Sequence, residues 1–123
     1  MTKNTEDHND AVTAKVRALN DAFRQSITSD TAIMAGGTGT LAPEMQGRML
    51  EAVRAFDAFT RDHDLWSEHE AGIVEVTQND SGEVLRIFFK IDCLCPTCLM
   101  PTDDAADPGK VVRQITLMPA DEY

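Results

Sequence analysis

The chain has 123 residues, which suits one domain able to bury about two-thirds of its unfolded surface without a disulfide or a metal. It carries 11 basic and 21 acidic residues, for a formal net charge of −10. Phosphate binding needs a concentrated basic patch, and the cations here are scattered. The composition therefore argues against direct binding to nucleic acid or to an anionic membrane.

The N-terminal stretch and the cysteines predict a cytoplasmic protein. Residues 1–10 are polar and acidic, and they lack the apolar core of a secretion signal. The longest uncharged run, residues 31–43, is too short and too rich in glycine to span a bilayer. All three cysteines lie within residues 93–98, which is a poor disulfide framework and is typical of a reducing compartment.

Residues 1–9 are expected to form a disordered tail, because no apolar residue after Met1 is available to pack. Residues 10–123 are expected to form a single α+β domain. Its first helix follows the tail, and we expect the charged face of this helix to be solvated. The opposite, apolar face is predicted from residues that recur at spacings of three and four: Val12, Val16, Leu19, Phe23 and Ile27.

Residues 31–35 form a short apolar stretch that predicts a strand, and the glycine-rich run 36–40 follows it. Glycine-rich loops cradle phosphates when they open a helix and a suitable lysine follows. No such lysine is present, so we interpret the run as a flexible turn. A second helix is then predicted over residues 43–59 from apolar residues at helical spacing: Met45, Met49, Leu50, Val53 and Phe56.

Residues 72–92 carry the clearest pattern in the chain and predict a β-hairpin. Leu85, Ile87, Phe89 and Ile91 occupy every second position of residues 84–92, the period that buries one face of a strand. Residues 78–82 contain the Asn, Asp, Ser and Gly that suit a tight turn. The strands 72–77 and 84–92 should therefore pair antiparallel, with the second as the central strand of the sheet.

A last strand is predicted over residues 110–118, where Val111, Ile115 and Leu117 share one face. The expected order is helix, strand, helix, strand, strand, strand. The fold class is α+β, with two helices packed on one face of a mainly antiparallel four-stranded sheet.

Five groups of residues carry a resemblance to a known family. They are Leu19-Asn20-Asp21 with Phe23-Arg24, Phe56-Asp57 with Phe59-Thr60, Glu68-His69-Glu70 with Gly72, Phe89-Lys90-Ile91-Asp92, and Ile115-Thr116-Leu117-Met118 with Asp121-Glu122-Tyr123. Through them the chain resembles a family of small bacterial domains of unknown function found on plasmids, prophages and other mobile elements. The resemblance implies a mobile-element setting and transfers no activity. The chain departs from the family at its cysteines, where members carry tyrosines and acidic residues, and at Pro119, where leucine is typical.

The three cysteines suggest a metal site. Cys93, Cys95 and Cys98 would supply three thiolates to a tetrahedral zinc, with His69 or His63 as the fourth ligand. Reduced surface thiols without a metal are the alternative reading. Cys95-Pro96-Thr97-Cys98 also resembles the C-P-x-C of dithiol oxidoreductases, but Pro101 argues against the helix that this chemistry needs.

Acidic residues gather in two segments and suggest a surface that binds a protein partner. Residues 57–70 carry one base against five acids, and a solvated loop is the alternative. We expect a non-catalytic protein that binds a host protein with a basic nucleic-acid-binding groove. The mobile-element setting extends this to an inhibitor of a nucleic-acid-guided defence complex, of the anti-CRISPR kind. The residues assigned to this surface are Asp62, Asp64, Trp66, Glu68, Glu70, Asp103, Asp104 and Asp107.

His69 is the best candidate for acid–base chemistry, because Glu68 and Glu70 flank it and a carboxylate orients an imidazole for proton transfer. No serine or cysteine nucleophile is obviously paired with it, and a histidine bonded to the loop backbone is the more common outcome. We therefore expect no enzymatic activity and no cofactor, with zinc binding as the alternative function.

Overall fold

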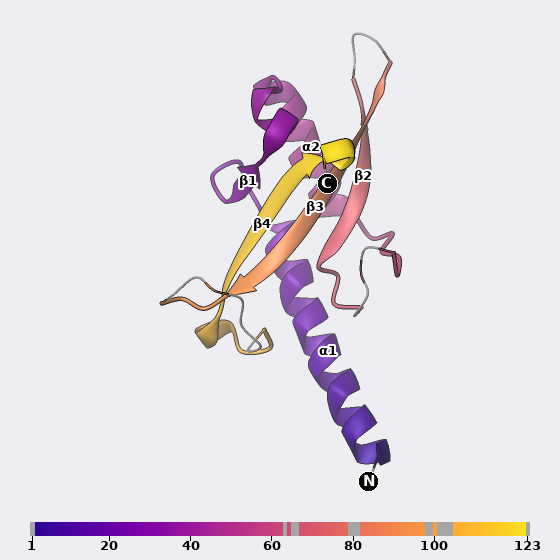
Figure 1. Ribbon diagram of the computed structural model, residues 1–123, viewed down its shortest axis with the longest axis vertical. Coiled ribbons are helices and arrows are strands. Elements are labelled where there is room, and N and C mark those ends of the chain that lie inside the picture. The colour runs from indigo at the N-terminus through magenta and orange to yellow at the C-terminus, as the bar shows by residue number, and fades with distance from the viewer. Residues whose placement is uncertain are drawn as a thin grey trace.

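The computed structural model describes residues 2–62, 64, 67–78, 82–97, 100 and 105–122, with side chains described from residue 11 onward. In this part of the chain two helices cover one face of a four-stranded sheet (Figure 1). None of its helices is both long enough and apolar enough to cross a membrane. The predicted α+β class and the predicted order of elements are confirmed. The elements are α1 (Thr2–Gln25), β1 (Ala32–Met34), α2 (Pro43–Ala55), β2 (Ala71–Thr77), β3 (Val84–Leu94) and β4 (Val112–Pro119).

The sheet has the strand order β1-β4-β3-β2. β2 and β3 form the predicted antiparallel hairpin, with Val74 opposite Ile87 and Gly72 opposite Phe89. β3 also pairs antiparallel with β4, so the predicted central position of β3 is confirmed. β1 adds to the other edge of β4 as the one parallel pair among the described strands.

The element bounds differ from the sequence pattern at both helices. α1 begins at Thr2, ahead of the apolar stripe, and the division into a tail and a domain stays a prediction. α2 ends at Ala55 and not at residue 59, because Phe56 has an extended backbone with φ −66° and ψ 132°. The rings of Phe56 and Phe59 nevertheless pack edge to face, 4.8 Å apart, against the core. The apolar residues that continue the helical spacing beyond residue 55 therefore belong to a loop whose phenylalanine rings pack against the core.

The hydrophobic core lies between the helices and the sheet. The face of β3 predicted from its alternation is confirmed, since Ile87, Phe89 and Ile91 are buried. The predicted apolar stripe is confirmed at Val16 and Ile27, which are buried, and at Phe23, which packs against the core, whereas Val12 is 39% exposed. Asn20 and Arg24 of α1 are buried as well. Part of the face expected to be solvated therefore faces the interior.

The glycine-rich run forms a 3-10 helix, η1 (Gly36–Thr40), between β1 and α2. Thr38 is fully buried, and its hydroxyl donates to the carbonyl oxygens of Ala35 and Leu117. The N–H of Gly37 donates to the Glu122 carboxylate at 3.2 Å. The run is thus fastened to the end of β4 and to the C-terminal 3-10 helix, η3 (Ala120–Glu122).

Candidate functional site

Buried polar side chains hold the link between α2 and β2, residues 56–70, against α1. Asn20 and Arg24 of α1 are 2% and 3% exposed, and Asp64 of the link is 4% exposed. A buried polar group costs free energy unless it is hydrogen-bonded, so the partners of these side chains define how the link is held.

The carboxylate of Asp64 shapes the end of the link. Its Oδ1 atom accepts hydrogen bonds from the main-chain N–H groups of Glu68 at 2.9 Å and His69 at 3.0 Å. Ser67 and His69 both have a φ of 57°, in the left-handed region that residues other than glycine seldom adopt. The buried carboxylate thus stabilises an uncommon turn, and this turn brings the His69 ring to α1.

The His69 ring contacts both α1 and the link. Its Nδ1 atom lies 2.8 Å from Oδ1 of Asp21, and the ring stacks on Phe59 with centroids 4.0 Å apart and planes inclined by 3°. Arg24 donates from Nη1 to the same Asp21 oxygen at 2.7 Å. The guanidinium carbon of Arg24 lies 5.0 Å from the centroid of the Phe59 ring. One carboxylate therefore joins a histidine and an arginine that contact the same aromatic ring.

The electrostatics of this cluster favour an ionised Asp21. Burial acts to raise the pKa of Asp21, but the hydrogen bonds and charges of Arg24 and His69 outweigh it and hold the pKa below the ordinary value of 3.8. Within the described chain, Nε of Arg24 is buried and has no hydrogen-bond partner. A cavity of about 380 Å³ lies beside the cluster, and Arg54 and Asp57 also line it. Its two arginines face two aspartates, so its charges are nearly balanced.

Asn20 connects the link to the last strand. Its Nδ2 group donates to the carbonyl oxygen of Glu68 at 2.9 Å, and its Oδ1 atom accepts from Nε of Arg113 on β4 at 2.7 Å. Arg113 also donates to the carbonyl oxygen of Ala105. The side chain of Asn20 is therefore satisfied, and it ties three separate segments together.

A second cavity, of about 230 Å³, is lined by Glu68 and Glu70, the two neighbours of His69 in the sequence. Lys90, Asp92 and Cys93 of β3 also line it. Burial raises the pKa of both glutamates above 4.5, and nearby carboxylates raise it further. For Glu70 these carboxylates are Glu68, Asp64 and Asp92, and the charge of Lys90 opposes them. The cavity therefore concentrates negative charge that is partly removed from water.

The structure separates the acidic residues that the sequence grouped as one surface. Asp62 and Asp107 are exposed, and Glu68 and Glu70 are partly buried in the second cavity. Asp64 is buried and serves the loop backbone, so its predicted place on a partner-binding surface is wrong. Trp66, Asp103 and Asp104 lie outside the described residues.

The predicted Cys₃His zinc site is only partly covered by the structure. Cys93 is a free thiol and Sγ of Cys95 lies 3.2 Å from the hydroxyl oxygen of Thr97, while Cys98 and the alternative ligand His63 lie outside the described residues. The His69 ring is engaged with Asp21 and Phe59. In the described ranges, no group of three or more His, Cys, Asp or Glu side chains is placed to hold a metal ion. Burial raises the pKa of Cys93 above 9.0, which favours the thiol over the metal-binding thiolate.

Sequence reasoning found His69 but not its partners. The expected neighbours were Glu68 and Glu70, whereas the observed partner is Asp21, from the first helix. Asn20 and Arg24 were likewise placed on a solvated face. A signal was present, since Asn20 and Arg24 follow Val16 at successive intervals of four, as residues of one helical stripe do.

Comparison with known proteins identifies a family. The family model described as "Protein of unknown function (DUF3768)" matches residues 12–122, so the chain belongs to this family. No curated protein and no solved structure matches the chain significantly. The phrases through which the sequence resembles a family of unknown function supply Asn20, Asp21, Arg24, Phe59 and His69 to the cluster described above.

Proposed function

We propose that this DUF3768 protein is a non-catalytic, acidic protein that binds a basic surface of a partner protein. The observation that carries the proposal is the shared cavity of Glu68, Glu70 and Asp92. The partner would be a nucleic-acid-binding protein with a basic groove, such as a nucleic-acid-guided defence complex, because such a groove complements a chain of net charge −10.

The cavity suits a lysine or arginine side chain. Glu68 and Glu70 lose solvation on folding, and among the described residues the ion pair in the cavity is Lys90 with Asp92, at 3.5 Å. The charges of Arg113 and Lys90 lower the pKa of Glu68 and of Glu70, respectively, by less than burial raises it. A cation from a partner would form charge-assisted hydrogen bonds with these carboxylates and would lower their raised pKa values. Binding would thereby offset the free-energy cost of desolvating the two glutamates on folding.

The surroundings of the cavity limit what enters it. Arg113 lies close enough to lower the pKa of Glu68, but its guanidinium is fixed by Asn20 and the carbonyl oxygen of Ala105. Asp62 is exposed on the same link and adds to the long-range attraction without shaping the cavity.

The cavity does the binding in this proposal, and His69 has a structural role. Its Nδ1 atom is engaged by Asp21 and its ring by Phe59, both of which position the turn that presents Glu68 and Glu70. The proposed function therefore assigns His69 no proton-transfer step.

Affinity capture from a host-cell lysate with matched variants tests the proposal. The double variant Glu68→Gln, Glu70→Gln removes two charges from the cavity, and Glu44→Gln, Glu51→Gln removes two exposed charges from α2. We expect the wild type and the α2 variant to retain one stoichiometric basic partner at low salt, and the cavity variant to lose it. If both variants lose the partner equally, net charge alone accounts for the binding and the cavity has no specific role. If the cavity variant retains the partner, the proposal is refuted.

A further inference from the structure

β2 and β4, the two strands that pair with β3, cover different lengths of it. β3 pairs with β2 from Val84 onward, but it pairs with β4 only from Ile87 onward, opposite Pro119. There β4 ends and the chain turns into η3. Among the described residues, the segment Val84–Arg86 therefore has a strand on one side only.

The main-chain groups of this segment alternate between its two sides. The N–H of Gln78 donates to the carbonyl oxygen of Glu83, and the N–H of Ile91 donates to that of Glu70. Odd-numbered residues of β3 thus direct their main-chain groups toward β2. By the alternation of an antiparallel ladder, the even-numbered Val84 and Arg86 direct theirs toward the side where β4 has ended.

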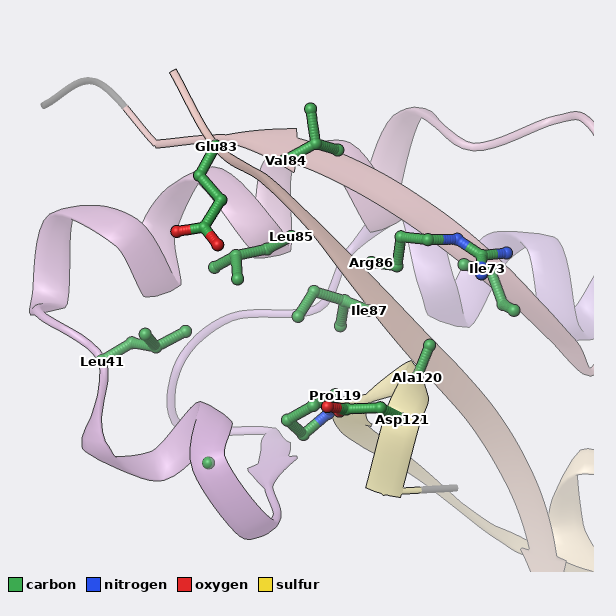
Figure 2. A pocket seen from close by; sticks show the side chains of 11 residues that line it. Leu41, Ile73, Glu83, Val84, Leu85, Arg86, Ile87, Pro119, Ala120 and Asp121 are labelled. Atoms are coloured by element: carbon green, nitrogen blue, oxygen red, sulfur yellow. The ribbon is translucent and has the colours of Figure 1, made fainter. Parts of the chain in front are cut away.

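A hollow of about 690 Å³ occupies the space beyond the end of β4. Figure 2 shows Leu41, from the loop before α2, opposite Leu85 and Ile87, with Pro119 at the end of β4. Glu83 and Asp121 also line the hollow, one at each end of the β3 segment's open side. Arg86, the cation in the lining, lies toward Ile73, and its Nε is 3.9 Å from the Glu75 carboxylate.

We infer that this hollow binds an extended peptide segment of a partner protein, which continues the sheet in the place that β4 vacates. The peptide would pair its main chain with Val84 and Arg86, as in other cases of strand addition. One apolar side chain would enter the hollow between Leu41 and Leu85. The carboxylates of Glu83 and Asp121 select lysine or arginine two positions away from that apolar residue, because alternate residues of a strand share a face.

This inference does not rest on the acidic cavity. The two sites lie near opposite ends of β3, since the hollow is lined by residues 83–87 and the cavity by residues 90–94. A failure of one therefore leaves the other standing, and the Glu68→Gln, Glu70→Gln variant should bind the peptide as the wild type does.

A library of seven-residue peptides tests the inference. Each peptide has a central apolar residue (Val, Ile, Leu or Phe) with Lys or Arg two positions away on either side, and binding is followed by amide NMR shifts of the full chain. We expect at least one peptide to bind with a Kd below about 1 mM and to shift the amides of Val84, Arg86 and Leu41. If no peptide binds at that concentration, or if the shifts centre on residues 68–70 and 92, the inference is overturned.

Two controls isolate the main-chain pairing. N-methylation of alternate amides keeps every side chain and charge of the peptide but removes the N–H donors on the edge that would pair with β3. We expect this to weaken binding by about tenfold or more. Val84→Pro removes the donor on the open side of β3, while Val84→Ala keeps it. Equal affinity for the methylated peptide would overturn strand addition even if Val84→Pro fails to fold. Self-association of the chain that Val84→Pro abolishes would instead assign the edge to a second copy.

Discussion

The Nδ1 atom of His69 lies 2.8 Å from Oδ1 of Asp21, so the loop before β2 is fastened to α1. Arg24 donates to the same oxygen and is itself 3% exposed. Among the described residues, the Asp21 carboxylate is therefore the group that forms an ion pair with this buried cation. Removing it affects both the helix and the loop.

Asp21→Ala should lower the free energy of unfolding by about 2 to 3 kcal/mol, because it leaves the buried Arg24 guanidinium without its carboxylate. Asp30→Ala, at an exposed turn position, is the control and should change stability by less than about 0.5 kcal/mol. Urea unfolding of the three proteins provides the measurement. Equal midpoints for the two variants would show that the Asp21 contact contributes nothing.

The same contact predicts a pH dependence. The folded-state pKa of Asp21 is lowered, so its stabilising contribution is complete above the ordinary value of 3.8 and is lost as pH falls through the folded-state pKa. The part of the stability difference between the wild type and Asp21→Asn that comes from the ionisation of Asp21 should therefore be complete at pH 5 and shrink in stronger acid. A difference that grows on acidification would contradict the assignment.

Two glycines should respond in opposite directions to alanine. A Cβ atom on Gly72 would lie 2.5 Å from Cε1 of Phe56 and 3.1 Å from Cε1 of Phe89, so Gly72→Ala should cost about 2 kcal/mol or more through displaced aromatic rings. A Cβ atom on Gly47, inside α2, meets nothing within 4 Å. Gly47→Ala should therefore stabilise the protein by about 0.5 to 1 kcal/mol, because alanine favours a helix interior. Thermal unfolding decides both, and a stabilised Gly72→Ala would refute the close packing at β2.

The hairpin was predictable because its information is local. The alternation in residues 84–92 and the turn residues before it specify β2 and β3 with their partners. The β1–β4 pairing joins Ile33 to Thr116, and no local pattern announces a contact between such distant segments. The sequence likewise shows Phe56 and Phe59 at helical spacing after Val53 but not that Phe56 leaves the helix.

The candidate site was less predictable than the fold because it depends on exceptions to burial rules. Asn20, Arg24 and Asp64 have side chains that are usually exposed, and each is buried here only because specific partners satisfy it. Those partners come from other segments, so the polar pattern of one helix or loop does not reveal them. The acidic link was accordingly interpreted as surface, although its central aspartate is a buried backbone cap.

Ser67→Gly should raise the free energy of unfolding by about 0.5 to 1 kcal/mol. Ser67 has a φ of 57°, where a side chain is strained and glycine is not, and the relief exceeds the extra chain entropy that glycine brings to the unfolded state. Ser29→Gly is the matched control, because Ser29 is exposed in a turn and has no positive φ. It should be destabilised slightly. Destabilisation of Ser67→Gly to the same extent would show that the turn carries no strain.

Neutralising the acidic cavity should separate stability from binding. Burial raises the folded-state pKa of Glu68 and Glu70 above 4.5, so ionising them opposes folding, and the wild type loses stability as pH rises through these raised values. The Glu68→Gln, Glu70→Gln variant should therefore match or exceed the wild type at neutral pH, by at most about 1 kcal/mol given solvent screening. This advantage should fade as pH falls through 4.5 and vanish well below it, where both glutamates are protonated in either state.

The same double variant should lose the basic partner, since the cation it binds needs ionised carboxylates. Stability is measured by urea unfolding at several pH values, and binding by capture at low salt, with Glu44→Gln, Glu51→Gln as the control for net charge. A variant that loses stability at neutral pH would mean that these carboxylates support the fold. In that case the ionised forms of Glu68 and Glu70 would not destabilise the free protein, and a partner's cation would have no desolvation cost to offset. The cavity would then lose its proposed role as a cation-binding site.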